Sequence, residues 1–304
     1  MANVLVIYFS QSGQQREILD SIVKPFVQQG DYVHFEEVKP VEAFPFPWNG
    51  FQFFNAFPET FFQQPLPLQP FSAKAFEEYN LIILGYQPWF LTPSRPISSF
   101  LQTEEAKTIL KGKPVVTVVG CRNMWLGSQE KVKAKLKEAK GNLVGHIAMA
   151  DRSSNLVSMV TILRWMFTGK RSPFLFFPKA GVSQADVDHA SSFGEQVRLA
   201  LTKKNFLPLQ AELNKLGAVD VKANLVLMEK RGQRGFGIWS KFVAAGGPIN
   251  STSRKIRVYT FMYVLPTAIV LLTPLLFIMS KLMLVILRKK LLAEIEYYKG
   301  VSLR

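Results

Sequence analysis

The chain has 304 residues, of which 48% are hydrophobic and 19% charged, a composition that excludes an intrinsically disordered protein. A single cysteine excludes a disulfide framework and a multi-cysteine zinc site, and three scattered histidines form no metal-binding pattern, so we expect no metal. The net charge of +15 is uneven. Residues 1–221 hold 23 Lys and Arg against 19 Asp and Glu, whereas residues 222–304 hold 14 against 3.

The order of apolar and polar segments predicts a parallel sheet whose strands alternate with helices. The expected strands are residues 3–9, 32–38, 80–86, 113–120 and 142–150, and the first of them is a continuous apolar run, as is typical of a strand buried on both faces. The expected helices are residues 16–28, 97–110, 129–139 and 183–202. The opening MANVLVIYFS has neither a basic leader nor a cleavage site, so we interpret it as the first strand of a cytoplasmic domain. The fold class is therefore α/β, with a doubly wound five-stranded parallel sheet.

The turn after the first strand has the composition of a phosphate-binding loop. Its residues are Ser10, Gln11, Ser12, Gly13, Gln14 and Gln15, and a helix is expected to begin directly after them. Backbone N–H groups at a helix N-terminus bind phosphate, serine hydroxyls add donors, and a glycine permits close approach. The turn lacks the GxGxxG of dinucleotide-binding folds and the lysine of a P-loop, which favours a phosphate such as that of FMN. An ordinary helix cap is the alternative interpretation.

Two further loops follow strands whose carboxyl ends lie at the same edge of the predicted sheet. They contain Gln87, Pro88, Trp89 and Phe90 after the third strand, and Cys121, Arg122, Asn123, Met124 and Trp125 after the fourth. Doubly wound sheets bind their ligands beyond this edge. We therefore expect Trp89 or Phe90 on one side of a flat heterocycle and Trp125 on the other. Each aromatic residue taken alone could equally be a packing feature.

Over residues 1–202 the sequence resembles flavodoxin-like FMN proteins. Ser10, Ser12 and Gly13 match the flavodoxin phosphate signature Thr/Ser-x-Thr/Ser-Gly-x-Thr, whereas Gln15 stands where that signature has a hydroxyl. The second and third loops are similar to the flavin-flanking loops of flavodoxins and flavodoxin-fold quinone reductases, and the third loop lacks the acidic residues that are common there. The resemblance implies that FMN binds on the loops 10–15, 87–90 and 121–125, with Arg122 near the flavin.

The whole chain also resembles a bacterial family of flavodoxin-like membrane proteins labelled dialkylresorcinol condensing enzymes, which occur with aryl-polyene pigment genes. The phrases PFPWNGFQFFNAFPE, GCRNMW and EKRGQRGFGIWSKF carry this likeness. Carbon–carbon condensation needs an activated nucleophile beside an acid or a base. No histidine lies within 20 residues of Cys121, the only cysteine. We therefore interpret Cys121 as a buried small residue or a flavin neighbour.

Two aromatic segments stand out from the regular alternation. Residues 38–79 hold seven prolines and twelve aromatic residues, and the proline spacing argues against one long helix. This insertion could pack on the sheet, cover the flavin or contact lipid, and Trp48, Phe53 and Phe54 could form an apolar entrance for a long-chain substrate. Residues 156–177 are apolar and basic at one end, as in an interfacial helix followed by a loop, and a buried helix is the alternative.

The C-terminal part of the chain carries the strongest membrane signal. Val258–Ser280 contains no charged residue, is long enough as a helix to span a hydrocarbon core of about 30 Å, and has basic flanks. Residues 222–257 mix basic and aromatic side chains, which suits anionic lipid headgroups, and the adjacent apolar run argues against nucleic acid. The positive-inside rule then places the main domain on the cytoplasmic face of the bacterial inner membrane.

These features divide the chain into a flavodoxin-like domain at 1–204, a basic juxtamembrane segment at 205–257, a membrane segment at 258–287 and a basic tail at 288–304. We expect a membrane-anchored FMN-binding redox protein that passes electrons or hydride to a lipophilic acceptor, either a quinone or a polyene-type lipid intermediate. A flavin-free accessory protein and a dialkylresorcinol condensing enzyme of lipid or pigment biosynthesis are the alternatives. The expected partners are anionic membrane lipids and a lipophilic substrate or redox partner protein.

Overall fold

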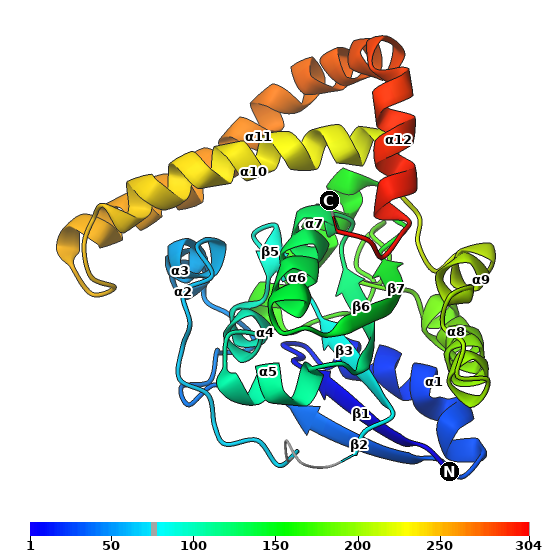
Figure 1. Cartoon of the computed structure of the whole chain (residues 1–304). Helices are drawn as coiled ribbons and strands as arrows, with labels where there is room; N and C mark the ends of the chain where they lie inside the picture. The colour runs from blue at the N-terminus through cyan, green and yellow to red at the C-terminus, as the bar shows by residue number, and fades with distance from the viewer. Residues whose placement is uncertain (74–77, 304) are drawn as a thin grey trace.

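The computed structural model describes residues 1–73 and 78–303, apart from the side chains of residues 269–270, 272–282 and 285 in one long helix. Its centre is a five-stranded parallel sheet (Figure 1). The strands are β1 (Asn3–Tyr8), β2 (Tyr32–Glu37), β3 (Leu81–Tyr86), β6 (Pro114–Cys121) and β7 (Asn142–Ala150). All five predicted strands are confirmed, and their ends agree with the predicted ones to within one residue.

The strand order is β2-β1-β3-β6-β7, which is the 2-1-3-4-5 order of a flavodoxin-like doubly wound sheet. Val4 of β1 pairs with Val33 of β2 on one side and with Leu81 of β3 on the other. Every residue of β3 is buried, as its continuous apolar sequence requires. The strand order reverses between β1 and β3, so a ligand crevice is expected beyond Tyr8 and Tyr86, the last residues of these strands.

Helices cover both faces of the sheet (Figure 1). On one face α1 (Gln14–Gln28) and α8 (Gln184–Thr202) pack so closely that a side chain on Gly194 would collide with the carbonyl oxygen of Ile22. Toward the other face lie α4 (Arg95–Phe100), α5 (Glu104–Leu110) and α6 (Leu126–Glu138). The single helix predicted over residues 97–110 is wrong: it is two helices, because Thr103 accepts a hydrogen bond from the Ala106 N–H and caps a new one.

The aromatic insertion contains two short helices, α2 (Gly50–Asn55) and α3 (Phe57–Phe61), in keeping with the predicted absence of one long helix. Phe54 and Phe57 form a second hydrophobic core with Val243, Val258 and Phe261 of the C-terminal helices. Further along the chain come a small hairpin and a helix, namely β4 (Pro88–Trp89), β5 (Thr92–Pro93) and α7 (Asn155–Thr168). The insertion therefore joins the sheet domain to the C-terminal helices.

The C-terminal third adds four helices. They are α9 (Leu209–Lys215), α10 (Ala223–Ala244), α11 (Thr252–Ile286) and α12 (Arg288–Tyr298). α9 packs against β7, while α10 and α11 run side by side and project from the domain as a helical arm, here called the arm (Figure 1). α12 returns to the domain, where Leu291 and Tyr298 join the main hydrophobic core. The segment predicted as a basic tail at 288–304 thus contributes side chains to the main hydrophobic core.

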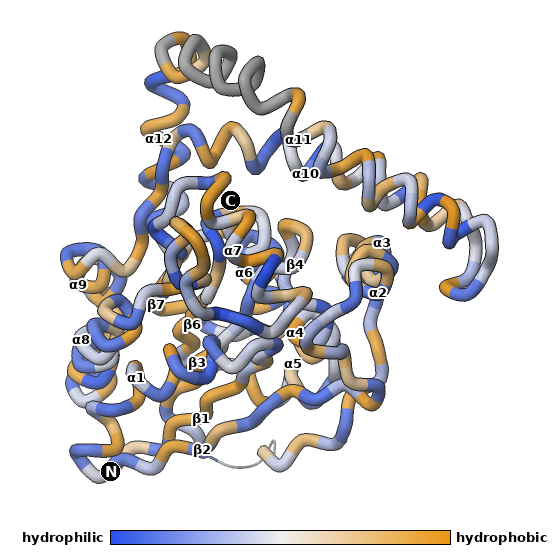
Figure 2. The backbone as a smooth tube through the Cα atoms, turned by 180° about the vertical axis from the view of Figure 1, so that it is seen from behind, coloured by the Kyte–Doolittle hydropathy of each residue, from blue (hydrophilic) through white to orange (hydrophobic). Residues whose placement is uncertain are grey.

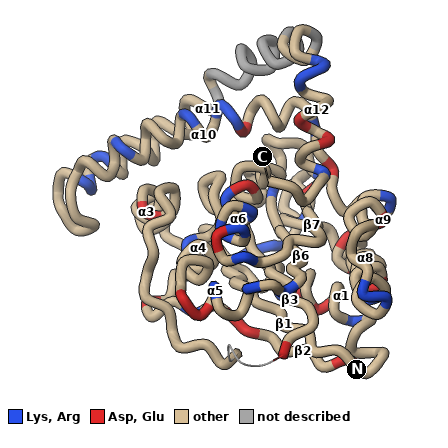
Figure 3. The backbone as a smooth tube through the Cα atoms, in the orientation of Figure 1, with Lys and Arg blue, Asp and Glu red and all other residues tan. Residues whose placement is uncertain are grey.

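The surface of the arm combines apolar and basic residues. Figure 2 shows apolar residues along α10 and α11, and Figure 3 shows Lys and Arg spaced along the same helices. Among the residues that the structure describes, no helix is long and apolar enough to cross a membrane. Part of the membrane segment predicted at Val258–Ser280 lies outside the described residues, so a membrane-spanning helix stays a prediction.

Candidate functional site

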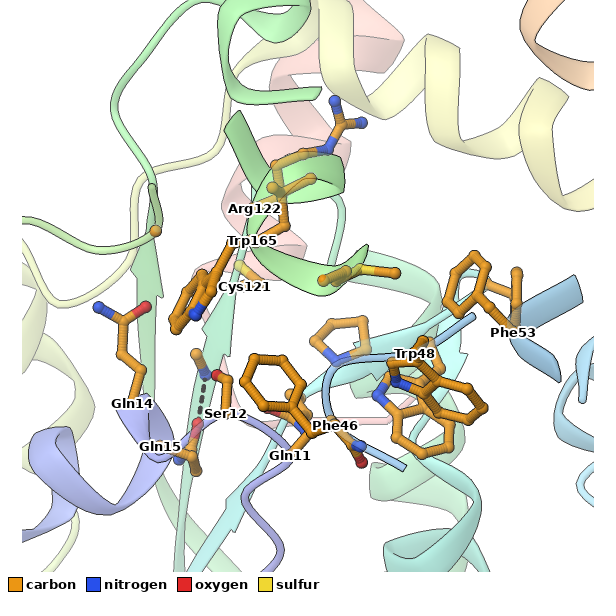
Figure 4. A pocket seen from close by; sticks show the side chains of 18 residues that line it. Gln11, Ser12, Gln14, Gln15, Phe46, Trp48, Phe53, Cys121, Arg122 and Trp165 are labelled. Carbon is orange, nitrogen blue, oxygen red and sulfur yellow. Dashed lines mark hydrogen bonds between the residues drawn. The ribbon is translucent and has the colours of Figure 1, made fainter. Parts of the chain in front are cut away.

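The three predicted loops meet at one cleft beyond the carboxyl ends of β1, β3 and β6 (Figure 4). The cleft is open to solvent and has a cavity volume of about 180 Å³, below the range of about 300–1,000 Å³ that is usual for ligand pockets. The predicted site residues that line it are Gln11, Ser12, Gln14, Gln15, Gln87, Pro88, Trp89, Phe90, Cys121 and Arg122. The predicted residues Ser10, Gly13, Asn123, Met124 and Trp125 do not line it.

The first loop ends at the N-terminus of α1, where Gly13 has a φ angle of +87°. This left-handed conformation favours glycine. An added Cβ would find no atom within 4 Å, so the glycine is required by its backbone angle and not by crowding. The first turn of a helix leaves N–H groups without intrahelical acceptors. The buried Ser10 Oγ and Gln11 Oε1 also have no hydrogen-bond partner among the described residues. The N–H groups and the Ser10 hydroxyl could donate to an anion, whereas the Gln11 amide oxygen can only accept a hydrogen bond.

Gln14 and Gln15 do not belong to that set of available groups, because their side chains already hold the protein together. The Gln14 amide exchanges two hydrogen bonds with the backbone of Val182, at 2.8 Å and 3.0 Å. The Gln15 amide donates to the Val118 carbonyl at 3.0 Å and accepts from the Gly120 N–H at 2.9 Å. The glutamine that replaces the signature hydroxyl therefore links the first loop to the end of β6.

The second loop is a tight hairpin between β4 and β5. Its two turn residues, Phe90 and Leu91, have φ angles of +50° and +63°, which side-chain-bearing residues rarely adopt. The Leu91 carbonyl accepts a hydrogen bond of 2.6 Å from Gln233 of α10, which holds the turn. Trp89 packs edge-on against Phe9, while the buried Gln87 Nε2 has no partner among the described residues. This loop therefore offers the cleft an aromatic surface and an unpaired amide donor.

The third loop contributes Cys121 and Arg122. The Arg122 guanidinium donates to the carbonyl oxygen of Asn155 at 3.0 Å and points away from Ser12 and Gln11 in Figure 4. Burial lowers its pKa, and Asp151 and Cys121 oppose that effect. Burial also raises the pKa of the Cys121 thiol, so this thiol stays protonated at neutral pH. Cys121 therefore lacks the thiolate that a nucleophile requires.

The expected stacking role of Trp125 does not hold in the structure. Trp125 is buried in the main core and packs on the His146 ring, with 4.8 Å between the ring centroids. Asn123 and Trp125 line a separate cavity with residues of β7 and α8. Because Trp125 lies directly before α6, its side chain fills the space between that helix and β7.

A different tryptophan completes the cleft. Trp165 lies on α7 with Ile162 and Met166, and these three side chains form a wall that we did not predict as part of the site. The apolar, tryptophan-bearing pattern of residues 156–177 does not by itself indicate the cleft. A side chain on Gly181 would collide with Gln14 and approach the Trp165 ring within 2.9 Å. The cleft therefore depends on packing between α1 and α7.

The insertion supplies the remaining wall. Phe46, Trp48 and Phe53 line the cleft, as expected for Trp48 and Phe53. Phe54 does not line it and belongs to the second core. The Trp48 ring contacts the Phe53 and Trp89 rings edge-on, at 5.8 Å and 5.6 Å between centroids. These contacts join the insertion to the second loop and close one side of the cleft with aromatic surface.

The side chains that line the cleft determine which chemistry it can support. One region carries the unpaired amide groups of Gln11 and Gln87, and the opposite walls are aromatic and aliphatic. Arg122 is the one charged side chain among the described residues that line it, and its guanidinium is engaged with α7. The lining therefore holds no carboxylate or histidine for acid–base catalysis and no activated nucleophile. Such a site is suited to binding a flat, polar-edged molecule.

No protein-family model matches the sequence, and no curated protein matches it. Solved structures with a similar chain include a flavoprotein from Lactobacillus acidophilus in complex with FMN, at 16% identity and a TM-score of 0.40. Two proteins described as flavoproteins, from Bacteroides uniformis and Bacteroides eggerthii, match at 14% and 17% identity, each with a TM-score of 0.37. The matches cover 49%, 54% and 49% of this chain and 93%, 97% and 89% of the others. About half of this chain thus lies outside each match.

Proposed function

We propose that this chain is an FMN-binding redox protein that works at a membrane surface and transfers electrons or hydride to a lipophilic acceptor. The observation that carries the proposal is the composition of the cleft. Its own side chains offer no acid, base or nucleophile, so a bound group must supply the chemistry. The flavodoxin-like strand order places this cleft at the position where such sheets bind FMN.

The residues present fit a flavin mononucleotide. The phosphate would lie at the N-terminus of α1, where Ser12 and the backbone beside Gly13 are available. The unpaired Gln11 Oε1 and Gln87 Nε2 supply one acceptor and one donor, which match the polar edge of a heterocycle. When bound, FMN would supply the capacity to accept and donate one or two electrons.

The roles of the protein's own side chains follow from where they lie. Trp89 and Trp165 present aromatic surface to the cleft from separate elements, and Phe46 packs against Trp165. Phe53 lies on the insertion and extends the apolar surface toward the arm, since it contacts both Phe90 and Phe54. A long apolar acceptor would be held by this surface, which also excludes water from the cleft.

The membrane part of the proposal rests on the arm. α10 and α11 contain one acidic residue, Glu229, against basic residues distributed along both helices. Ile256, Tyr259 and Tyr263 are exposed on the described part of α11. Exposed apolar and tyrosine side chains next to lysine and arginine suit the headgroup region of an anionic bilayer. We propose that this bilayer is the bacterial inner membrane and that the domain lies on its cytoplasmic face.

The condensing-enzyme alternative finds no support in the cleft. Its one candidate nucleophile, Cys121, has a thiol whose pKa is raised by burial. Among the described residues that line the cleft there is no histidine or carboxylate that could activate this thiol. A flavin-free accessory protein remains the alternative outcome of the binding experiment that follows.

The test is a fluorescence titration of FMN into the purified full-length protein, compared with two glycine variants. Gly13→Val and Gly112→Val both place a side chain at a positive φ, +87° and +70°, and neither Cβ meets an atom within 4 Å. Both should lose similar stability, about 1–2 kcal/mol. We expect only Gly13→Val to weaken FMN binding, because only Gly13 borders the phosphate position. Wild-type protein without saturable binding would overturn the proposal and favour the flavin-free alternative.

A further inference from the structure

The segment after α7 is an excursion from the wall of the cleft. The chain leaves that wall at Met166 and returns to it at Gly181, and both residues line the cleft. The Met166 carbonyl accepts a hydrogen bond of 2.8 Å from the Trp48 N–H, so the start of the excursion is fixed to the insertion. Its end is fixed by the paired hydrogen bonds between Val182 and Gln14. Both ends of the excursion therefore lie at the wall of the cleft.

The tip of this excursion exposes two large apolar side chains. Residues 174–177, here called the Phe turn, form a tight turn in which Leu175 is 89% exposed and Phe176 83% exposed. Isolated exposed apolar residues are common on protein surfaces. Two adjacent ones at the tip of an excursion from the cleft wall form a compact apolar point. A partner that buries both side chains would stabilise the complex.

The Phe turn has a defined structure that presents these side chains. Phe174 and Phe177 exchange backbone hydrogen bonds of 3.2 Å and 2.8 Å, and their rings stack at 4.9 Å between centroids. Arg164 of α7 lies over the Phe174 ring at 4.3 Å and donates to the carbonyl oxygens of Lys170 and Ser172. The turn is thus braced from below by α7, and its apolar tip is directed outward.

The charge around the Phe turn identifies the chemistry of its partner. Residues 169–182 contain three basic residues and no acidic one. Lys170 and Lys179 flank the turn and are exposed, whereas Arg171 is paired with Glu17 at 2.9 Å. An apolar point between two exposed cations matches a bilayer with anionic headgroups, where apolar side chains enter the acyl boundary and lysines remain at the phosphates.

We propose that the Phe turn inserts into an anionic lipid surface and thereby holds the rim of the cleft against the bilayer. Together with the arm it would form a second, independent membrane contact, and it would orient the apolar wall of the cleft toward substrate dissolved in the lipid. The use of the cleft for a lipophilic substrate rests on the proposed function. The lipid contact itself does not depend on flavin binding.

The test places an environment-sensitive fluorophore at the tip of the Phe turn in the full-length chain. Leu175→Cys would carry the fluorophore, and Leu207→Cys, at a leucine that is 95% exposed, is the matched control. Leu207 lies past the opposite end of α8, a helix of 19 residues and therefore about 28 Å long. Wild-type protein treated in parallel measures any labelling of Cys121, a half-buried cysteine whose raised thiol pKa should make it react poorly.

Vesicles that contain phosphatidylglycerol should shift the Leu175 probe to the blue, and lipids brominated near the headgroup end of the acyl chain should quench it. The Leu207 probe should respond to neither. The double change Leu175→Ser with Phe176→Ser should weaken vesicle binding by about tenfold or more, because two apolar side chains lose their burial. High salt should leave the Leu175 response largely intact, since apolar burial is not screened.

Three results would overturn the inference. One is co-sedimentation of the full-length chain with vesicles while the Leu175 probe senses no lipid, which would leave the arm as the membrane contact and the proposed function intact. Another is a blue shift of the probe at position 175 when unlabelled protein is added in the absence of vesicles, which would make the Phe turn a contact between copies of this chain. The third is no vesicle binding at all. FMN titration of the same samples reports separately whether the flavin proposal holds.

Discussion

Replacing Glu229 by glutamine should stabilise the protein at about pH 8 while changing its stability little at about pH 5. Glu229 lies on α10, and its buried carboxylate accepts hydrogen bonds from the backbone N–H groups of Leu126 and Gly127, at 3.1 Å and 2.6 Å. It thereby attaches the arm to the first turn of α6, directly after the third loop. Burial is the main cause that raises its pKa from 4.5 to about 7, and the hydrogen bonds and Lys131 oppose it.

The direction of the pH dependence follows from proton uptake. Between the two pKa values the folded protein binds a proton at Glu229 that the unfolded chain has released, so the free energy of unfolding falls as the pH rises through this interval. One pKa unit corresponds to about 1.4 kcal/mol. From about pH 5 to about pH 8 the wild type should therefore lose about 2–3 kcal/mol at this residue, whereas Glu229→Gln cannot lose it.

The assay is urea unfolding of wild type and variant across this pH range, followed by tryptophan fluorescence. Taking the difference between the two proteins removes the contributions of all other titrating groups. Glu138→Gln on the exposed face of α6, whose carboxylate pairs with Lys135 at 2.9 Å, is the surface control and should change the free energy of unfolding by less than about 1 kcal/mol. The opposite result would be a free energy of unfolding for the variant that falls below that of wild type as the pH rises. In that case the N-terminus of α6 stabilises the carboxylate more than burial destabilises it, and the reasoning is refuted.

Two other predictions concern the walls of the cleft and the base of the arm. Phe53→Ala should slow flavin reoxidation by a lipophilic quinone about tenfold and leave reoxidation by ferricyanide unchanged. Phe62→Ala in the same insertion should change neither rate, because only Phe53 lines the cleft. Equal slowing with both acceptors would contradict the role of an apolar wall. Arg254→Ala should reduce the free energy of unfolding by about 3–5 kcal/mol, since it leaves the buried Glu59 without its two hydrogen bonds of 2.8 Å. Arg257→Ala removes an exposed hydrogen bond to the Phe242 carbonyl and should lower the free energy of unfolding by less than about 1 kcal/mol in the same urea assay. If both variants lower it equally, the buried ion pair of Arg254 stabilises the protein no more than the exposed contact does.

The strands and most helices of the domain could be predicted from the sequence because their signals are local. An apolar run such as that of β3 has few alternatives to burial in a parallel sheet. The single helix predicted over 97–110 was wrong because a side-chain cap at Thr103 starts a new helix. That cap is a single hydrogen bond, which the periodicity of apolar residues does not reveal.

The edge of the sheet that carries the cleft could also be predicted, since parallel strands place the loops that follow them at one edge. The sequence itself thus determined the α/β class, the five strands, the Gly13 turn and ten of the residues that line the cleft. It further determined that basic charge is concentrated in the C-terminal third.

Only the tertiary structure decided which side chains face the cleft and which are already engaged. Gln14 binds Val182, which is 168 residues away in the chain, and Gln15 binds Val118, 103 residues away. Trp125 and Trp165 are both buried tryptophans, yet one packs on His146 in the core and the other lines the cleft. The periodicity of apolar residues and the composition of turns reflect the local conformational preferences of residues that are neighbours in sequence. Which side chains face the cleft depends instead on contacts between distant segments, and these contacts exist only once the helices have packed on the sheet.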